Sequence, residues 1–174
     1  MSRYVNILFF VAVLIYMAGL HFNVAYLWLL KVIPILILGG AVFSMQASHV
    51  RSILLLALFF SGCGDLLLAF NLFIYGVAAF LLAQLSYAWL FKSSWKGLQH
   101  RRPLTALLIG CILVMASLLL PKLGDLQLPV MAYLVAISMM GVLAVQSSLP
   151  MRWAVLGALF FILSDSFIAI NKFI

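Results

Sequence analysis

Residues 52–70 read SILLLALFFSGCGDLLLAF, a stretch that holds a single charged side chain, Asp65. A helix that crosses the hydrocarbon core of a bilayer takes about 20 predominantly apolar residues, and this stretch has that length and character. Further apolar stretches of similar length lie on both sides of it, separated by short polar connectors. The sequence therefore predicts membrane-spanning helices rather than a water-soluble core.

The whole chain has the composition of such a protein. Of its 174 residues, 68% are hydrophobic and 7% are charged, whereas a soluble domain carries about 25% charged residues. The apolar stretches are too long and uninterrupted for the strands of a transmembrane barrel, which take about 10 residues of alternating polarity. We predict an all-α, polytopic transmembrane helical bundle that forms a single domain over residues 1–174. The seven predicted spans are 4–20, 24–45, 52–70, 73–91, 103–120, 129–148 and 152–171.

The Lys and Arg side chains predict the orientation, because short cytoplasmic loops retain positive charge. Placing the connector between the fourth and fifth spans in the cytoplasm puts most cations inside. The inner cations are then Arg3, Arg51, Lys92, Lys96, Arg101, Arg102 and Arg152, and the outer ones are Lys122 and Lys172. We therefore predict a cytoplasmic N-terminus, in an integral protein of a bacterial inner (plasma) membrane.

Charge and ligand residues exclude other classes of function. The net charge of +7 does not form a basic nucleic-acid-binding face, because the cations lie between apolar spans. His21, His49 and His100 lie at or beyond span ends, with no two on one helix at ligand spacing, so we predict no metal site. Cys63 and Cys111 lie inside apolar stretches and match no metal or disulfide spacing. We predict no cofactor.

Three charged residues lie inside the predicted spans, namely Lys31, Asp65 and Asp165. A charge at the bilayer centre costs about 2.5–3.5 kcal/mol, so such residues usually face the bundle interior and mark a site. Counting about 1.5 Å of rise per residue from the cytoplasmic span ends puts all three near ~20 Å above the inner face, with Tyr133 at a similar height. We expect these side chains to converge on one cavity.

Two carboxyl groups and one cation at one level suggest acid and base chemistry. The excess negative charge is relieved most easily when one carboxyl is protonated, which leaves an acid beside a base. The alternative is a structural ion pair, in which Lys31 binds one aspartate and merely holds helices together. Gln84 and Tyr87 are expected somewhat nearer the cytoplasm. Asp125 lies in an outer loop and is expected to be a solvated turn residue.

These residues lie in elements that resemble the YhhN family of integral-membrane lysoplasmalogenases, over about residues 24–173. The matching elements are Lys31 with Pro34, Phe-Ser-x-x-Gly-Asp ending at Asp65, Tyr87, Pro129 with Tyr133, and Gly-Ala-x-x-Phe-x-x-Ser-Asp from Gly157 to Asp165. The chain departs from the family pattern at Val32, where Pro is frequent, and at Gln84, where His is common. It also has seven predicted spans where family members usually have eight.

The resemblance implies hydrolysis of the vinyl ether bond of lysoplasmalogens, which yields a fatty aldehyde and glycerophosphocholine or glycerophosphoethanolamine. This reaction protonates a double-bond carbon and adds water to an oxocarbenium-like cation, steps that suit a carboxylic acid and a carboxylate. We expect Asp65 and Asp165 to be catalytic, without assigning which is the acid. The substrate-binding residues are then expected to be Lys31, Gln84, Tyr87 and Tyr133. The expected partners are a lysophospholipid, water and membrane lipids.

Transport is the main alternative function. A small proton-coupled transporter would use the same intramembrane Asp and Lys residues as a proton relay. An odd number of spans argues mildly against it. A third alternative is a non-catalytic assembly subunit, in which the polar cluster would be purely structural.

Overall fold

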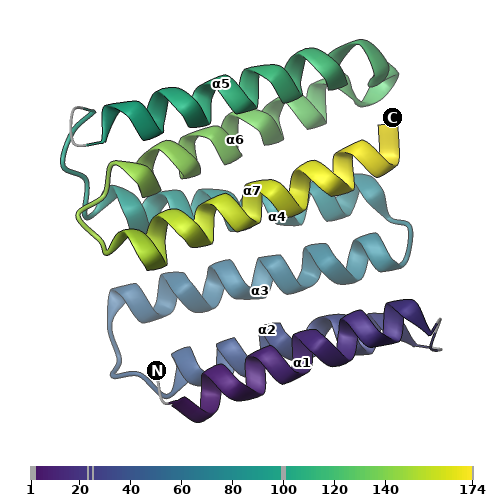
Figure 1. Ribbon diagram of the computed structural model, residues 1–174, viewed down its shortest axis with the longest axis vertical. Helices are drawn as coiled ribbons and strands as arrows, with labels where there is room; N and C mark the ends of the chain where they lie inside the picture. The colour runs from purple at the N-terminus through teal and green to yellow at the C-terminus, as the bar shows by residue number, and fades with distance from the viewer. Residues whose placement is uncertain (1–2, 23, 25, 99–100, 174) are drawn as a thin grey trace. The chain divides into compact units, whose positions relative to one another are not determined.

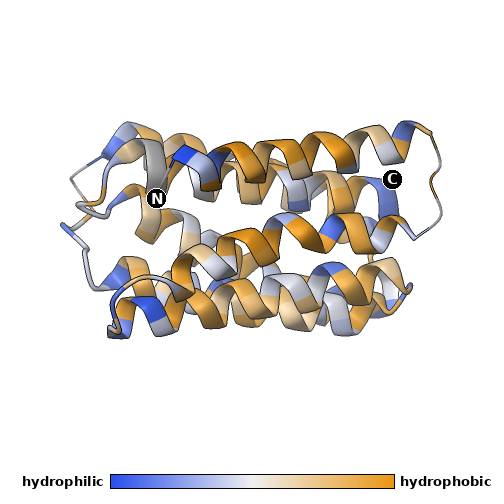
Figure 2. Cartoon of the chain, turned by 90° about the horizontal axis from the view of Figure 1, so that it is seen from below, coloured by the Kyte–Doolittle hydropathy of each residue, from blue (hydrophilic) through white to orange (hydrophobic). Residues whose placement is uncertain are grey.

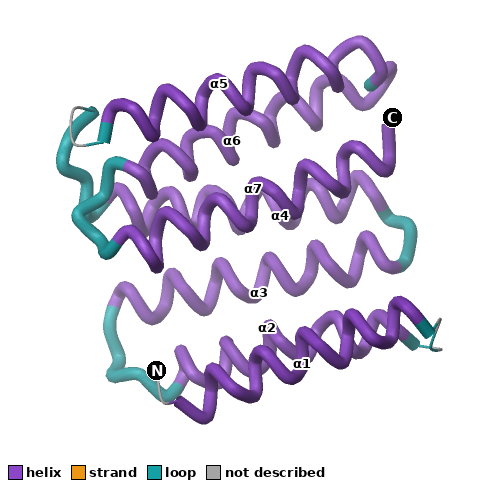
Figure 3. Tube along the Cα trace, viewed as in Figure 1, coloured by secondary structure: helices purple, strands orange, loops and turns teal. Residues whose placement is uncertain are grey.

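The computed structural model describes residues 3–22, 24, 26–98 and 101–173, without the side chains of Arg152 and Trp153. In these ranges the chain forms helices joined by short loops, and no strand is present (Figure 3). The helices are α1 (Arg3–His21), α2 (Leu27–Phe43), α3 (His49–Ala69), α4 (Phe73–Lys92), α5 (Arg102–Leu119), α6 (Gln127–Val145) and α7 (Met151–Phe173). The predicted all-α fold is confirmed. The expectations for His100 and for the Arg152 side chain lie outside the described residues.

Helix length and composition agree with a protein that crosses the membrane several times. Among the described residues, six helices are long and apolar enough to span a bilayer, and α2 is a shorter apolar helix. Most of the length of the helices is hydrophobic, with a few hydrophilic segments inside them, and many hydrophilic residues lie at helix ends (Figure 2). The chain is therefore an integral membrane protein. The cytoplasmic position of the N-terminus stays a prediction.

The bounds of α2 differ from the predicted span 24–45. The helix begins at Leu27 because Tyr26 has a φ of 63°, a left-handed conformation that a right-handed helix cannot include. It ends at Phe43, where the Ser44 hydroxyl donates to the Gly40 carbonyl at 2.9 Å. Apolar residues also precede Leu27, and the apolar Met45 follows Ser44, so hydropathy alone overestimated the length of this helix.

The end of α6 also differs from the prediction, at Val145 rather than residue 148. The next residues turn toward the connector that follows α4, where the Ser148 amide donates to the Ser94 carbonyl at 2.7 Å. Gln146, which is fully buried, holds the same turn through bonds from its amide nitrogen to Thr105 Oγ1 and the Leu98 carbonyl. Backbone pairing between two connectors therefore stops the helix.

The chain divides into two compact units, Met1–Ala83 and Gln84–Ile174, with the boundary inside α4. In the first unit α1 packs against α2, and α2 packs against α3 (Figure 1). A Cβ atom at Gly64 of α3 would lie 2.7 Å from the Phe80 ring of α4, so glycine permits this close approach. The single-domain organisation stays a prediction.

The second unit is organised around α6, which packs against both α5 and α7. Its buried side chains Ile137, Met140 and Ala144 form the core together with residues of the C-terminal half of α4 and the N-terminal half of α7. A Cβ atom at Gly141 would lie 2.9 Å from Leu108 of α5. The small residues of α6 therefore allow its neighbours to approach closely, as in other membrane helix bundles.

Candidate functional site

Lys31 and Asp65 form an ion pair inside the first unit. Lys31 lies one turn into α2, and its Nζ atom is 2.7 Å from Oδ1 of Asp65 on α3. The two side chains are 26% and 19% exposed, so both charges are largely removed from the surface. The sequence left open which aspartate Lys31 would meet, and the structure selects Asp65. Such a pair offsets the cost of placing either charge alone in an apolar environment.

Local packing explains why the ion pair forms at this point. Ile35 is one turn beyond Lys31, and Gly62 is about one turn before Asp65, so each lies on the same helix face as its charged neighbour. A Cβ atom at Gly62 would be 3.5 Å from Cγ2 of Ile35, which is ordinary van der Waals contact. Gly62 and Ile35 therefore mark the place where α2 and α3 pack together beside the ion pair, and an alanine at residue 62 would fit there.

Ser61 is a polar residue of this region that the sequence analysis did not single out. It is 6% exposed, and its hydroxyl has no hydrogen-bond partner within the described residues. Ser61 lies four residues before Asp65 and therefore on the same face of α3. A sequence feature could have identified it, because Ser61 is the serine of the Phe-Ser-x-x-Gly-Asp element.

Asp165 is the centre of a second polar cluster, which lies in the second unit. The Tyr133 hydroxyl on α6 donates to Oδ2 of Asp165 on α7. Nε2 of Gln84 on α4 donates to Tyr133 Oη at 3.2 Å and to the same Asp165 oxygen at 3.4 Å. Three helices therefore position this carboxyl group. Gln84, expected nearer the cytoplasm, reaches the level of Asp165.

The Gln84 amide has hydrogen-bonding capacity beyond these two contacts. The residue is fully buried, and its Oε1 has no hydrogen-bond partner within the described residues. A buried carbonyl without a donor costs about 1–3 kcal/mol, and this oxygen can accept a further hydrogen bond. Tyr87, one turn further along α4, lies edge-on to Phe161 of α7, with ring centroids 6.1 Å apart.

An apolar cavity of about 290 Å³ borders Asp165 in the second unit. It lies among α5, α6 and α7, and Tyr133 and Asp165 form part of its wall. Nearly all other lining side chains are apolar, and the Ser166 hydroxyl donates to the Ile162 carbonyl of its own helix. The Asp165 carboxyl is thus held by hydrogen bonds where a hydrocarbon-like group can approach it.

The predicted site residues are found in two groups. The first unit brings Lys31 and Asp65 together, and the second brings Gln84, Tyr133 and Asp165 together. The convergence of both groups on one cavity stays a prediction. Asp125 lies in the exposed turn Gly124–Leu126, as expected. Within the described part of the chain, no group of three or more His, Cys, Asp or Glu residues is arranged to hold a metal ion.

Comparisons with known proteins agree with the resemblance that the motifs indicate. The chain is similar to proteins named lysoplasmalogenase from Mycobacterium bovis and Mycobacterium tuberculosis, with 34% identity over 147 residues in each case. The match covers 79% of this chain and 56% of each relative, so the chain spans about half the length of these curated relatives. No solved structure matches significantly. The YhhN family model matches residues 26–174, and the chain therefore belongs to the YhhN family.

Proposed function

We propose that this chain is a membrane-embedded hydrolase that cleaves the vinyl ether bond of lysoplasmalogens. The name of its mycobacterial relatives and its family membership support this activity. The observation that carries it is the Asp165 carboxyl group, which three helices hold through Tyr133 and Gln84 at the wall of an apolar cavity. General acid–base catalysis needs a carboxyl group that is held in a fixed position.

The reaction proceeds by proton transfer to carbon. A carboxylic acid donates its proton to the second carbon of the alkenyl chain, and the double-bond electrons form the new C–H bond. The first carbon and the ether oxygen then share the positive charge, which a carboxylate stabilises. Water adds to the first carbon and gives up one proton to a carboxylate, which forms the hemiacetal. The hemiacetal hydroxyl then loses its proton, the bond from the first carbon to the glycerol oxygen breaks, and that oxygen takes up a proton. The products are a fatty aldehyde and a glycerophospho-base, and no redox partner is needed.

Asp65 and Asp165 supply the acid and the carboxylate in this proposal, with the order unassigned. Lys31 binds the substrate phosphate through its ammonium group, whose remaining donors are not used by Asp65. Gln84 accepts a hydrogen bond at Oε1 from the attacking water or the glycerol hydroxyl, and Tyr133 and Tyr87 shape the same region. A lysophospholipid from the bacterial inner membrane and water are the substrates.

An aldehyde assay in heavy water tests this function. Purified protein in detergent is incubated with a 1-alkenyl lysophosphatidylethanolamine in D₂O, and the fatty aldehyde is analysed by mass spectrometry. We expect aldehyde that carries one deuterium at the second carbon, because solvent supplies the transferred proton. The matched 1-alkyl lysolipid has no vinyl ether and is expected to stay intact. Absence of aldehyde from the alkenyl lipid would contradict the proposal and favour the transporter alternative.

A further inference from the structure

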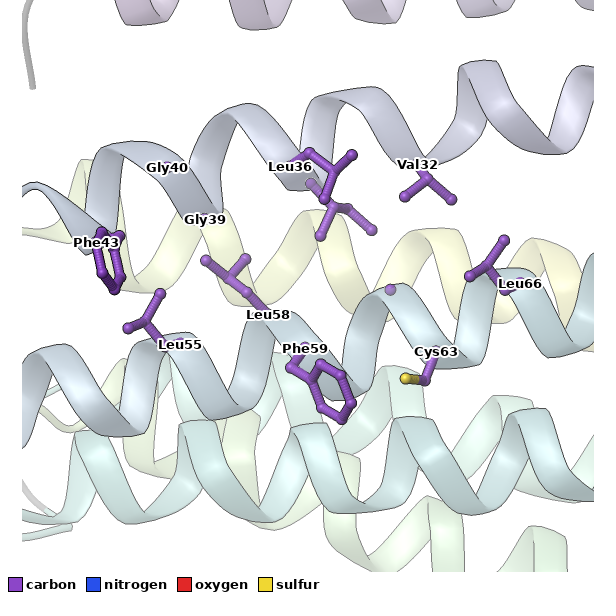
Figure 4. A pocket seen from close by; sticks show the side chains of 12 residues that line it. Val32, Leu36, Gly39, Gly40, Phe43, Leu55, Leu58, Phe59, Cys63 and Leu66 are labelled. Carbon is purple, nitrogen blue, oxygen red and sulfur yellow. The ribbon is translucent and has the colours of Figure 1, made fainter.

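A long apolar groove lies between α2 and α3 in the first unit. Its volume is about 610 Å³, within the range of about 300–1,000 Å³ that is usual for small-molecule sites. Figure 4 shows Val32 of α2 opposite Leu66 of α3 at one end, and Phe43 of α2 opposite Leu55 of α3 at the other. Apart from the Cys63 thiol, the groove is lined only by hydrocarbon side chains and glycines. Such a lining suits a hydrocarbon chain and no polar group.

The groove has the length of one lipid chain. Its lining runs from Val32 to Phe43 on α2 and from Leu66 back to Leu55 on α3. On each helix this is about eleven residues, or about 16 Å at a rise of 1.5 Å per residue. The hydrocarbon core of a bilayer is about 30 Å thick, so one leaflet of chains occupies about 15 Å. One extended chain therefore matches the groove from end to end.

One end of the groove lies near the Lys31–Asp65 ion pair, and neither of these two residues lines the groove itself. Val32 and Leu66, which line that end, directly follow Lys31 and Asp65 in the sequence. The Lys31 ammonium has three donors, and its contact to Asp65 uses one of them. An ammonium group with unused donors next to one end of a chain-length apolar groove complements an amphiphile whose anionic group lies close to the start of its single chain.

We infer that the groove between α2 and α3 binds the hydrocarbon chain of a single-chain phospholipid, with the phosphate at Lys31. That this chain is the alkenyl chain of a substrate rests on the proposed function. The cavity beside Asp165 is the competing location, and it is smaller, at about 290 Å³. Neither lining includes Lys, Arg or His, but of the two only the groove has a lining residue, Val32, that is next in sequence to a cation, Lys31. Lys31 therefore favours the groove as the site for a phospholipid.

Two glycines of α2 set the depth of the groove and the length of chain that it accepts. A Cβ atom at Gly39 or Gly40 would meet nothing within 4 Å, so a larger side chain can enter the groove without displacing the protein. Leucine is also the better helix former. In Gly39→Leu the unobstructed groove would run from Val32 to residue 39, or about 10 Å. This variant should exclude long chains and keep short ones.

Binding of non-hydrolysable lipids tests the inference independently of catalysis. The probes are 1-hexadecyl and 1-octyl glycerophosphocholine, measured in nanodiscs of diacyl phosphatidylcholine. In Gly39→Leu we expect the dissociation constant of the hexadecyl lipid to rise at least about tenfold, because several CH₂ groups lose their contacts. The octyl lipid should bind as in the wild type. Gly110→Leu is the matched control, since Gly110 of α5 is also open and lines neither cavity.

A second measurement uses the wild-type protein and so does not depend on folding of a variant. A hexadecyl glycerophosphocholine with a diazirine at the chain end is photolysed in the same nanodiscs, and the labelled peptide is identified. Saturable labelling near Phe43 and Leu55 is expected, at the groove end remote from Lys31. Labelling of α5–α7 peptides, labelling that does not saturate, or unchanged hexadecyl affinity in Gly39→Leu would overturn the inference. If groove labelling occurs without aldehyde formation, the proposed function fails and the binding site stands.

Discussion

Replacing Asp165 with asparagine is expected to lower the rate of aldehyde formation by about 10²–10⁴-fold, the contribution of a positioned acid or base. The amide keeps the shape of the carboxyl group and an oxygen that accepts from Tyr133 and Gln84. It can neither donate a carboxylic proton nor carry negative charge. The folded structure should therefore survive while the chemistry is lost. Initial rates and thermal unfolding in the same detergent measure both effects.

The chain supplies its own control for this experiment. Asp125 is the third carboxyl group and lies exposed in the turn Gly124–Leu126. Asp125→Asn should keep the wild-type rate.

Tyr133→Phe removes one hydrogen-bond donor to the Asp165 carboxyl, and such a bond is worth about 1.5–3 kcal/mol when the acceptor is charged. It should lower kcat/KM by about 10- to 100-fold. An Asp165→Asn protein that folds and keeps its rate would refute the role of this carboxyl.

Removal of the Lys31 charge is expected to destabilise the protein strongly. In Lys31→Met, Asp65 keeps a largely buried carboxyl group without the ammonium 2.7 Å away. An unpaired charge inside a membrane helix costs about 2.5–3.5 kcal/mol, so the free energy of unfolding should fall by about that amount. Reversible unfolding in detergent measures the change. Lys122→Met, at an exposed position in the short 3-10 helix Leu120–Lys122, is the matched control and should be neutral.

A double variant separates a structural ion pair from a catalytic one. Lys31→Met combined with Asp65→Leu removes both charges, and apolar replacement of a whole buried pair is often neutral or stabilising. We expect the free energy of unfolding to return to about the wild-type value, while aldehyde formation is lost because the Asp65 carboxyl group is absent. If the activity returned together with the stability, the pair would serve only to hold α2 against α3.

Much of the fold could be predicted from the sequence, because a membrane span must be apolar along its whole length and satisfy its own backbone hydrogen bonds. The seven apolar stretches correspond to α1–α7. The ends of α2 and α6 were misplaced where Tyr26 takes a left-handed conformation and where two connectors pair. One cause is a backbone conformation and the other is a contact between distant parts of the chain, and the hydropathy of a sequence reports neither.

The sequence predicted the height of several site residues in the membrane, but it did not predict which of their side chains contact one another. Counting residues along each span placed Lys31 and Asp65 at one level, and the structure pairs them. The same count separated Gln84 from Tyr133, which are hydrogen-bonded. Part of this error arises because α6 ends at Val145, so the height of Tyr133 was overestimated. Helices that are apolar all round give no sign of which face meets which neighbour, so the pairings required the structure.

The central claim is that both aspartates serve one reaction, and the Asp65→Asn/Asp165→Asn double variant tests it most directly. Groups that act as one catalytic unit are strongly non-additive. The measurement is the rate of aldehyde formation by the wild type, the two single variants and the double variant, all folded in the same detergent. We predict that each single variant loses at least about 10²-fold and that the double variant is no slower than the slower single variant. A single variant with the wild-type rate, or losses that multiply in the double variant, would contradict the account.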